Sequence, residues 1–468
     1  MKKQHLFYFS ILSLLMAFLF LSGTSGCGSG GNNGGGANGG GNNGGGNNGG
    51  GANTVPLSIT VTGIGEGAVT SDLGGINCSK AGGTCQTSLS SGSQVTLTAT
   101  AAPGYFFNGW LGGACPKIGT CTLSLNAATA VQASFINIAY QSSRDLDPAQ
   151  DAPNNPSALN LWFSNADKSN SHALAATAFD SFRPIFSPDG DKLSFVSNRP
   201  VNGASMASQS HNLWVVNADG SDAHSLTALD VTDVNIASGS VYPQQWSPNG
   251  GKILFTSTRD INSGTAATAN LTNNLWVIDA DGSNLMVLAG LDVADVNSGG
   301  GQWSPDGSKI LFSSTRNTDK TPSANPNNDS NIWLMNADGS NPEPLTQITT
   351  LDTFANFPIW SPDGSQIAFE SNRSLSDDQN AAPTAKNIWI ADADGNNIRH
   401  LTQKTAISSS KPQWSPDGSL IAFLSNQDID DPNATTPGPT NIWAIKADGS
   451  EEAFPLTRKK GGGAFIQA

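Results

Sequence analysis

Basic residues are scarce in this chain, which has 23 Lys and Arg against 37 Asp and Glu and a formal net charge of −14 at pH 7. A protein of this charge repels phosphate backbones, so we expect no nucleic-acid partner. The same charge gives no electrostatic attraction to anionic lipid headgroups. Any attachment to a membrane must therefore come from something other than surface charge.

Charged residues are few overall, at 13% of the chain, whereas Gly is abundant with 52 residues. This composition favours a turn-rich, all-β protein. Cysteine is also scarce: there are five, and none follows Cys121. An odd number of Cys leaves one without a disulfide partner, so one of the five needs another role.

Short motifs that commonly carry catalysis are missing as well. The chain has no Gly-x-Ser-x-Gly elbow, no phosphate-binding Gly-Lys loop and no His-Glu-x-x-His motif. We therefore predict no catalytic residue, and we expect a non-catalytic binding protein.

The N-terminus has the pattern of an export signal. Lys2 and Lys3 precede the apolar run 6–21, and small residues then lead to Cys27. The Ser25-Gly26-Cys27 sequence resembles the lipobox of bacterial lipoproteins, although Thr24 stands where that family usually has Leu. The resemblance implies that 1–26 is a signal peptide and that Cys27 carries a lipid. The alternative is a plain signal peptide with an unmodified Cys.

The segment after Cys27 is almost only Gly and Asn, so we predict a flexible tether over 27–54. We expect the exported protein to be lipid-anchored to the bacterial cell envelope, at the outer membrane, on its periplasmic or its surface side. The lipid would be its only contact with the membrane.

Alternating apolar and polar residues over 55–135 predict a small β domain. A domain of this size has little core, and disulfides would compensate. Its four cysteines allow three sets of pairings, of which Cys78–Cys85 with Cys115–Cys121 closes the shortest loops. The segments Asn77-Cys78, Phe107-Asn108-Gly109-Trp110 and Cys115 to Cys121 resemble the divergent InlB-type bacterial repeat. We expect Trp110 to be a core residue.

From 136 to 468 one pattern recurs. Its marker is Ser-Pro-Asp/Asn-Gly, a tight turn in which Pro presets φ and Gly accepts positive φ; it starts at Ser187, Ser247, Ser304, Ser361 and Ser415. A short apolar strand follows each turn. A later strand carries Asn-Leu/Ile-Trp, with Trp162, Trp214, Trp276, Trp333, Trp389 and Trp443.

Repeated four-strand units with tight turns predict a six-bladed β-propeller. The markers resemble the TolB family of propeller repeats. Unit one starts at Ile138 without a first strand, so we expect the tail Gly463–Gln467 to supply it. The fold class is thus all-β, with a propeller of four-stranded blades preceded by a small disulfide-bonded β domain.

Both kinds of tight turn fall on one face of the propeller, and the long connections fall on the other. Binding residues usually lie on such loops, so we predict that the long-loop face binds the ligand. The alternative is that these loops have changed neutrally during evolution and have no function. An Arg follows the second strand in five blades, either to bind an anion or to hold the framework: Arg144, Arg199, Arg259, Arg316 and Arg373. Paired segments between blades add candidate binding carboxylates, Asp230, Asp233, Asp292 and Asp295.

Closely spaced carboxylates also suggest a Ca²⁺ site, because Ca²⁺ takes six to eight oxygen ligands. The candidates are Asp145, Asp147, Asp428 and Asp430. None of them lies in an EF-hand sequence, and ordinary loops are also rich in Asp. We expect no other cofactor.

These observations favour an envelope lipoprotein, monomeric, that docks a protein or peptide on the long-loop face. The alternative is a carbohydrate-processing or other hydrolytic or lyase enzyme with a site in the propeller channel. Some TolB-like propellers are lyases in which several His hold a metal. Here His172, His224 and His400 fall on fourth strands of separate blades, so we expect no such cluster.

Overall fold

The computed structural model describes residues 53–466 apart from 103–104, 114, 117–118, 143–159, 165–171, 176–179, 202–210, 228–243, 260–271, 290–295, 322, 325–328, 349–351, 376–384, 404–406, 429–437 and 461–463. Within these ranges the chain contains strands and turns and no α-helix, as the composition predicts. The described part accordingly has no helix long and apolar enough to cross a bilayer. The predicted signal peptide, Cys27 and most of the tether lie outside the described residues.

The N-terminal domain is built from nine strands: β1 (Thr54–Thr62), β2 (Gly67–Ser71), β3 (Asn77–Ser79), β4 (Gly82–Thr84), β5 (Gln86–Ser90), β6 (Ser93–Ala101), β7 (Phe106–Leu111), β8 (Cys121–Leu125) and β9 (Thr129–Ile136). They form two sheets, in the orders β5-β1-β9-β7 and β4-β3-β2-β6-β8. The inward residues of both sheets, including Leu57, Val95 and Phe135, are fully buried. Trp110 belongs to this core and donates its indole N–H to the carbonyl of Gly119 at 2.7 Å.

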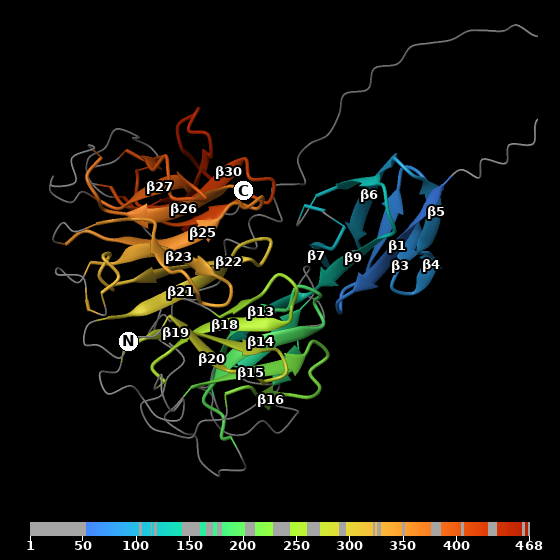
Figure 1. The fold of residues 1–468 in the computed structure, drawn as a ribbon, viewed down its shortest axis with the longest axis horizontal. Helices are drawn as coiled ribbons and strands as arrows, with labels where there is room; N and C mark the ends of the chain where they lie inside the picture. The colour runs from blue at the N-terminus through green and yellow to red at the C-terminus, as the bar shows by residue number, and fades with distance from the viewer. Residues whose placement is uncertain are drawn as a thin grey trace, which may run out of the picture.

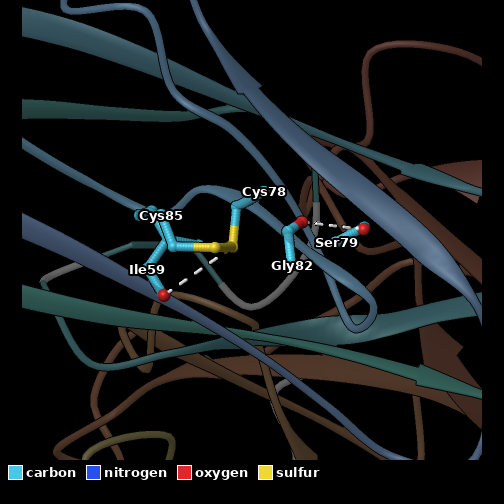
Figure 2. Close-up of a disulfide and its surroundings, with 5 residues drawn as sticks. All are labelled: Ile59, Cys78, Ser79, Gly82 and Cys85. Atoms are coloured by element: carbon cyan, nitrogen blue, oxygen red, sulfur yellow. Dashed lines mark hydrogen bonds between the residues drawn. A yellow bond between two sulfur atoms is a disulfide. The ribbon is translucent and has the colours of Figure 1, made fainter.

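Two disulfides reinforce this small core. Cys78 joins Cys85, and Cys115 joins Cys121, which is the pairing that short loops favour. Figure 2 shows the first bridge between Cys78 on β3 and Cys85, which lies between β4 and β5; the sulfur of Cys78 lies 3.8 Å from the carbonyl oxygen of Ile59. The bridge therefore contacts β1, an inner strand of the other sheet.

Six antiparallel sheets follow, coloured green to red in Figure 1. Blade one contains β10 (Ile138–Ser142), β11 (Asn160–Ser164) and β12 (His172–Ala175); blade two contains β13 (Ser181–Phe186), β14 (Lys192–Ser197), β15 (Asn212–Asn217) and β16 (His224–Ser225); blade three contains β17 (Gln245–Trp246), β18 (Lys252–Ser257), β19 (Asn274–Asp279) and β20 (Met286–Ala289). Blade four contains β21 (Ser298–Trp303), β22 (Lys309–Ser314), β23 (Asn331–Asn336) and β24 (Glu343–Pro344); blade five contains β25 (Ala355–Trp360), β26 (Gln366–Ser371), β27 (Asn387–Asp392) and β28 (Arg399–His400); blade six contains β29 (Ser409–Trp414), β30 (Leu420–Ser425), β31 (Asn441–Lys446) and β32 (Phe454–Pro455). The predicted six-bladed propeller is confirmed.

Blade one has three strands among the described residues, and β10 occupies the second-strand position. The tail forms β34 (Ala464–Ile466), which pairs with β33 (Arg458–Lys460) rather than with β10. The expectation that the tail completes blade one is therefore wrong. Only three Gly separate β33 from β34, and a hairpin closed by so short a Gly-rich loop costs less chain entropy than a strand carried across to another blade.

The Ser-Pro turns owe their shape to a repeated set of hydrogen bonds. In blade four, the amide of Gly307 donates to the carbonyl of Ser304 at 2.9 Å, closing the turn. Ser304 Oγ donates to Asp306 at 2.5 Å and accepts from the amide of Lys309 at 2.9 Å. The same contacts recur in the other four turns, with Asn249 replacing Asp in blade three.

At the opposite end of the blade, the start of the Asn-Ile-Trp strand meets a Leu-Thr pair that follows the fourth strand in several blades, as at Leu401-Thr402. In blade five, Thr402 Oγ1 donates to the side chain of Asn387 and accepts from the amide of Ile388, both at 2.9 Å. Blades two, four and six repeat this clamp. The clamp ties the end of the fourth strand to the start of the third.

Apolar side chains of neighbouring blades share each core. Val196 and Val215 of blade two, for example, pack in one cluster with Phe255 and Trp276 of blade three. This explains why the second strands are apolar on both faces. The first strands lie innermost, because β13, β17, β21, β25 and β29 contact one another in series.

Candidate functional site

The propeller has two unequal faces. The tight-turn face carries the Ser-Pro turns and the Asp-Gly turns that join third to fourth strands, as at Asp219-Gly220. The long-loop face carries the connections between second and third strands and between blades. Most of the long connections lie outside the described residues, but their roots and the starts of the inner strands are described.

A β-bulge interrupts the inner strand of four blades near the long-loop face. The register shifts in β13, β21, β25 and β29. At the bulge, Arg183, Phe357 and Lys411 have φ of 58°, 53° and 53°, and Gly300 has 68°. A left-handed conformation costs a non-Gly residue about 1–2 kcal/mol. Strain of this kind is often found at binding sites, and here it recurs around the innermost strands.

Side chains of the preceding blade hold two of these bulges. The amide of Arg183 donates to Gln141 Oε1 at 2.9 Å, and the amide of Lys411 donates to Glu370 Oε2 at 3.0 Å. Gln244, from the next blade, donates to the carbonyl of Arg183 at 2.7 Å. The strained backbone is therefore fixed from both neighbouring blades.

Glu370 is the centre of a small charged group between blades five and six. Its side chain is 1% exposed, and Oε1 lies 3.2 Å from Nζ of Lys386, which is 43% exposed. The Lys386 ammonium also lies 5.2 Å from the centre of the Phe354 ring. A buried carboxylate requires such partners, so Glu370 holds the Lys386 side chain at the inner edge of the long-loop face.

Four of the Arg residues that follow the second strands stack on the Trp residues of the third strands. Arg199, Arg259, Arg316 and Arg373 place their guanidinium groups 5.6, 6.0, 5.3 and 4.9 Å from the rings of Trp214, Trp276, Trp333 and Trp389. Burial lowers the pKa of Arg199 and Arg259 to about 10. Within the described ranges, Nε of Arg199, Arg259 and Arg316 has no hydrogen-bond partner. Stacking on Trp is therefore one contact that these Arg side chains make with the framework. Arg144 lies outside the described residues.

The predicted carboxylate sites fall largely in undescribed segments. Asp230, Asp233, Asp292, Asp295, Asp145, Asp147 and Asp430 lie outside the described residues, and Asp428 lies within them. In the described part of the chain, no group of three His, Cys, Asp or Glu could hold a metal. His172, His224 and His400 lie on β12, β16 and β28, the separate fourth strands predicted for them. The Ca²⁺ site stays a prediction.

The bulge residues and Glu370 were not identified from the sequence. A signal was present, because Arg183, Phe357 and Lys411 each precede a Pro inside an inner strand. Proline within a strand pattern marks a bulge or an edge. Nothing in the sequence indicates that Glu370 reaches the next blade.

These features define a TolB-like propeller joined to a small disulfide-bonded β domain. Residues 57–139 match the family model described as the divergent InlB B-repeat domain. That match lies over the segment where the Cys and Gly-Trp pattern suggests the same resemblance.

Several known proteins are similar to the propeller. Dipeptidyl-peptidase 5 of Porphyromonas gingivalis is 24% identical over 329 residues, which cover 63% of this chain and 43% of the relative. TolB from Acinetobacter baumannii is 16% identical with a TM-score of 0.40, covering 69% of this chain and 64% of that one. The oligogalacturonate lyase from Vibrio parahaemolyticus is 15% identical with a TM-score of 0.44, covering 68% and 74%. The chain spans 19%, 43% and 54% of the three curated relatives that it matches.

The expectation that the protein is not an enzyme is corrected by these comparisons. A relative named as a dipeptidyl-peptidase matches 63% of this chain. Missing short motifs were a poor reason to exclude catalysis, because propeller enzymes do not have to carry those motifs in their blades. Binding and catalysis are both compatible with the fold.

Proposed function

We propose that the long-loop face of the propeller binds a protein or an extended peptide at the inner ends of its blades. The observation that carries the proposal is the set of strained bulges in the inner strands. A left-handed Arg, Phe or Lys is retained at equivalent positions of three blades. Backbone strain of this kind is often found where a ligand is held.

The charge of this region supports a partner with carboxylate groups. Arg183, Lys386 and Lys411 all belong to the long-loop ends of their blades, in a chain whose formal net charge is −14. Local cations in an acidic protein favour acidic groups on the partner and fix its orientation. The neighbouring Phe354 and Phe357 add aromatic surface, which is common at protein interfaces.

The location follows from the N-terminal sequence. We propose that the protein is exported to the bacterial cell envelope and that a lipid on Cys27 holds it there. The Lys-rich start, the apolar run 6–21 and the small residues before Cys27 support this. Changing Cys27→Ser should release the protein from the membrane fraction; a variant that stays in that fraction would contradict the anchor.

A docked peptide and a peptide substrate would use the same surface, so binding and turnover need to be measured together. Peptides selected from a display library on the full mature chain provide the probe. Their affinity is compared between Lys411→Asn, at a bulge, and Lys446→Asn, which removes one positive charge on the tight-turn side. Asn tolerates the left-handed conformation, so the first change leaves the bulge intact.

We expect Lys411→Asn to weaken binding at least tenfold and Lys446→Asn to leave it unchanged. Equal affinities for both variants would place the site elsewhere and refute the proposal. Mass spectrometry of the same peptides after incubation shows whether any of them is cleaved. Cleavage that Lys411→Asn slows would assign a peptidase reaction to this face.

A further inference from the structure

The Ser-Pro turns form a continuous row of contacts around the tight-turn face. A Cβ placed on Gly250 would lie 3.6 Å from Cδ of Pro188, in the turn of the preceding blade. The same contact follows from blade to blade at 3.5 Å for Gly307 and Pro248, 3.4 Å for Gly364 and Pro305, and 3.7 Å for Gly418 and Pro362. Each turn therefore packs on the one before it.

Blade two breaks this pattern, because blade one has no first strand among the described residues and no Ser-Pro-Asp-Gly sequence of its own. The N-terminal domain occupies that position instead. A Cβ on Gly190 would lie 2.7 Å from Ser134 Oγ, 2.8 Å from Ile136 Cγ2 and 3.0 Å from the Cα of Gly63. Figure 1 shows this domain, in blue and teal, beside the green strands of blade two.

Hydrogen bonds fix the same contact. The amide of Gly63 donates to Asp191 Oδ1 at 3.1 Å, and Asn108 Nδ2 donates to the carbonyl of Pro188 at 3.0 Å. The amide of Asp191 donates to Asp189 at 3.1 Å, as in the other turns. Its side chain differs from the hydroxyls of Ser308, Ser365 and Ser419, which donate to the Asp of their own turns. In blade two the Ser hydroxyl of this position is replaced by a carboxylate, which accepts a hydrogen bond from the N-terminal domain.

An apolar side chain completes the interface. Ile64, in the loop after β1, packs on the buried cluster of blades one and two, which includes Leu161, Phe163 and Phe195. Removing apolar surface of this side chain from water stabilises the contact. The N-terminal domain thus contributes directly to the core of the propeller.

We propose that the N-terminal domain is a structural brace that takes the place of the missing turn of blade one and holds blades one and two together. It is not an independent module on a flexible linker. Because the brace lies on the tight-turn face, the long-loop face stays uncovered by it. This role goes beyond the proposed binding function and does not depend on it.

Hydrogen exchange of the full chain, followed by mass spectrometry, tests the brace. Asp191→Ser introduces the residue that blades four to six have at this position, and it removes the acceptor for the amide of Gly63. Ile64→Asp places a charge in the core that the two domains share. The control is Leu73→Asp, the same kind of change at a side chain of the same domain that is 45% exposed. Strands β22 and β26 of distant blades serve as the internal reference.

We expect exchange in β10, β11 and β14 to become about fivefold faster in Asp191→Ser, the loss of one hydrogen bond, and more than tenfold faster in Ile64→Asp. Leu73→Asp should leave these strands at the parental rate. If Ile64→Asp unfolds the N-terminal domain itself, the result for Asp191→Ser tests the proposal, because Asp191 lies in the propeller. Parental exchange of β10 and β14 in Asp191→Ser would overturn the proposal.

Discussion

The side-chain amide of Asn108 donates a hydrogen bond to the carbonyl oxygen of Pro188 at 3.0 Å, across 80 residues of sequence. Asn108 also donates to Ser134 Oγ at 3.3 Å, so one side chain links β7, β9 and the first Ser-Pro turn. Both residues belong to motifs that are recognisable separately in the sequence, Phe-Asn-Gly-Trp and Ser-Pro-Asp-Gly. Their contact joins two repeats of different families into one body.

The first prediction compares two glycines in equivalent turns. Gly190 and Gly418 have φ of 76° and 73°, so an Ala suffers the same backbone strain at both. Only at Gly190 would the new methyl group overlap Ile136 and Gly63. We expect Gly418→Ala to lower the free energy of unfolding by about 1–2 kcal/mol, and Gly190→Ala to lower it by about 1–3 kcal/mol more. Urea unfolding of both variants provides the measurement. Equal losses of unfolding free energy would show that the N-terminal domain does not pack closely on Gly190.

The sequence predicts those parts of the fold that repeat. Ser-Pro-Asp-Gly and Asn-Ile-Trp recur because the same hydrogen bonds recur in each blade, and their period therefore identifies the propeller. A contact that occurs in only one blade produces no repeated motif in the sequence. Glu370 stands where other blades have Val196, Thr256, Ser313 and Leu424, so its bond to the amide of Lys411 could not be predicted. The strand that pairs with the C-terminal tail was wrongly predicted for the same reason. A strand that occurs only once carries no repeated pattern that would fix its pairing or register.

The second prediction concerns the Thr clamp. Thr402 satisfies both the amide of Ile388 and the side chain of Asn387, which are fully buried. Thr402→Ala leaves them unpaired, and we expect a loss of about 1–3 kcal/mol in the free energy of unfolding. Thr402→Ser keeps the hydroxyl and should retain most of the stability. Blade three already has Ala289 at the corresponding place, so Ala is tolerated but costly. If the Ala and Ser variants unfold at the same urea concentration, the clamp contributes nothing.

The third prediction concerns pH. Hydrogen bonds from Ser304 and Ser361 hold the pKa values of Asp306 and Asp363 below their ordinary range. A carboxylate whose pKa is lower in the folded state stabilises the fold above its unfolded pKa, about 4, and this contribution is lost as the pH falls through the folded value. For these two groups we expect no change in stability between pH 7 and 5, and a decline below pH 4.

Asn249 suggests the matched variants for this test. Its turn keeps the bond from Ser247 at 2.8 Å with no titrating group. The double variant Asp306→Asn with Asp363→Asn should therefore fold and show a shallower decline below pH 4, whereas Asn249→Asp should steepen it. Denaturant unfolding at pH 3 to 7 measures the slopes. Identical slopes in all three proteins would mean that these turns do not contribute to acid unfolding.

The last prediction tests whether the Arg residues that follow the second strands have a structural role or bind a ligand. Arg259 is 5% exposed, stacks 6.0 Å from the Trp276 ring, and has no hydrogen-bond partner for Nε within the described residues. Replacing a buried, incompletely paired charge by an apolar side chain of similar volume is often neutral or stabilising. We expect Arg259→Met to change the free energy of unfolding by less than about 1 kcal/mol, because it keeps the packing on Trp276. Arg259→Ala removes that packing and should cost about 2 kcal/mol or more. A Met variant as unstable as the Ala variant would show that the charge of Arg259 has a partner. The Arg residues after the second strands would then again be candidates for ligand binding.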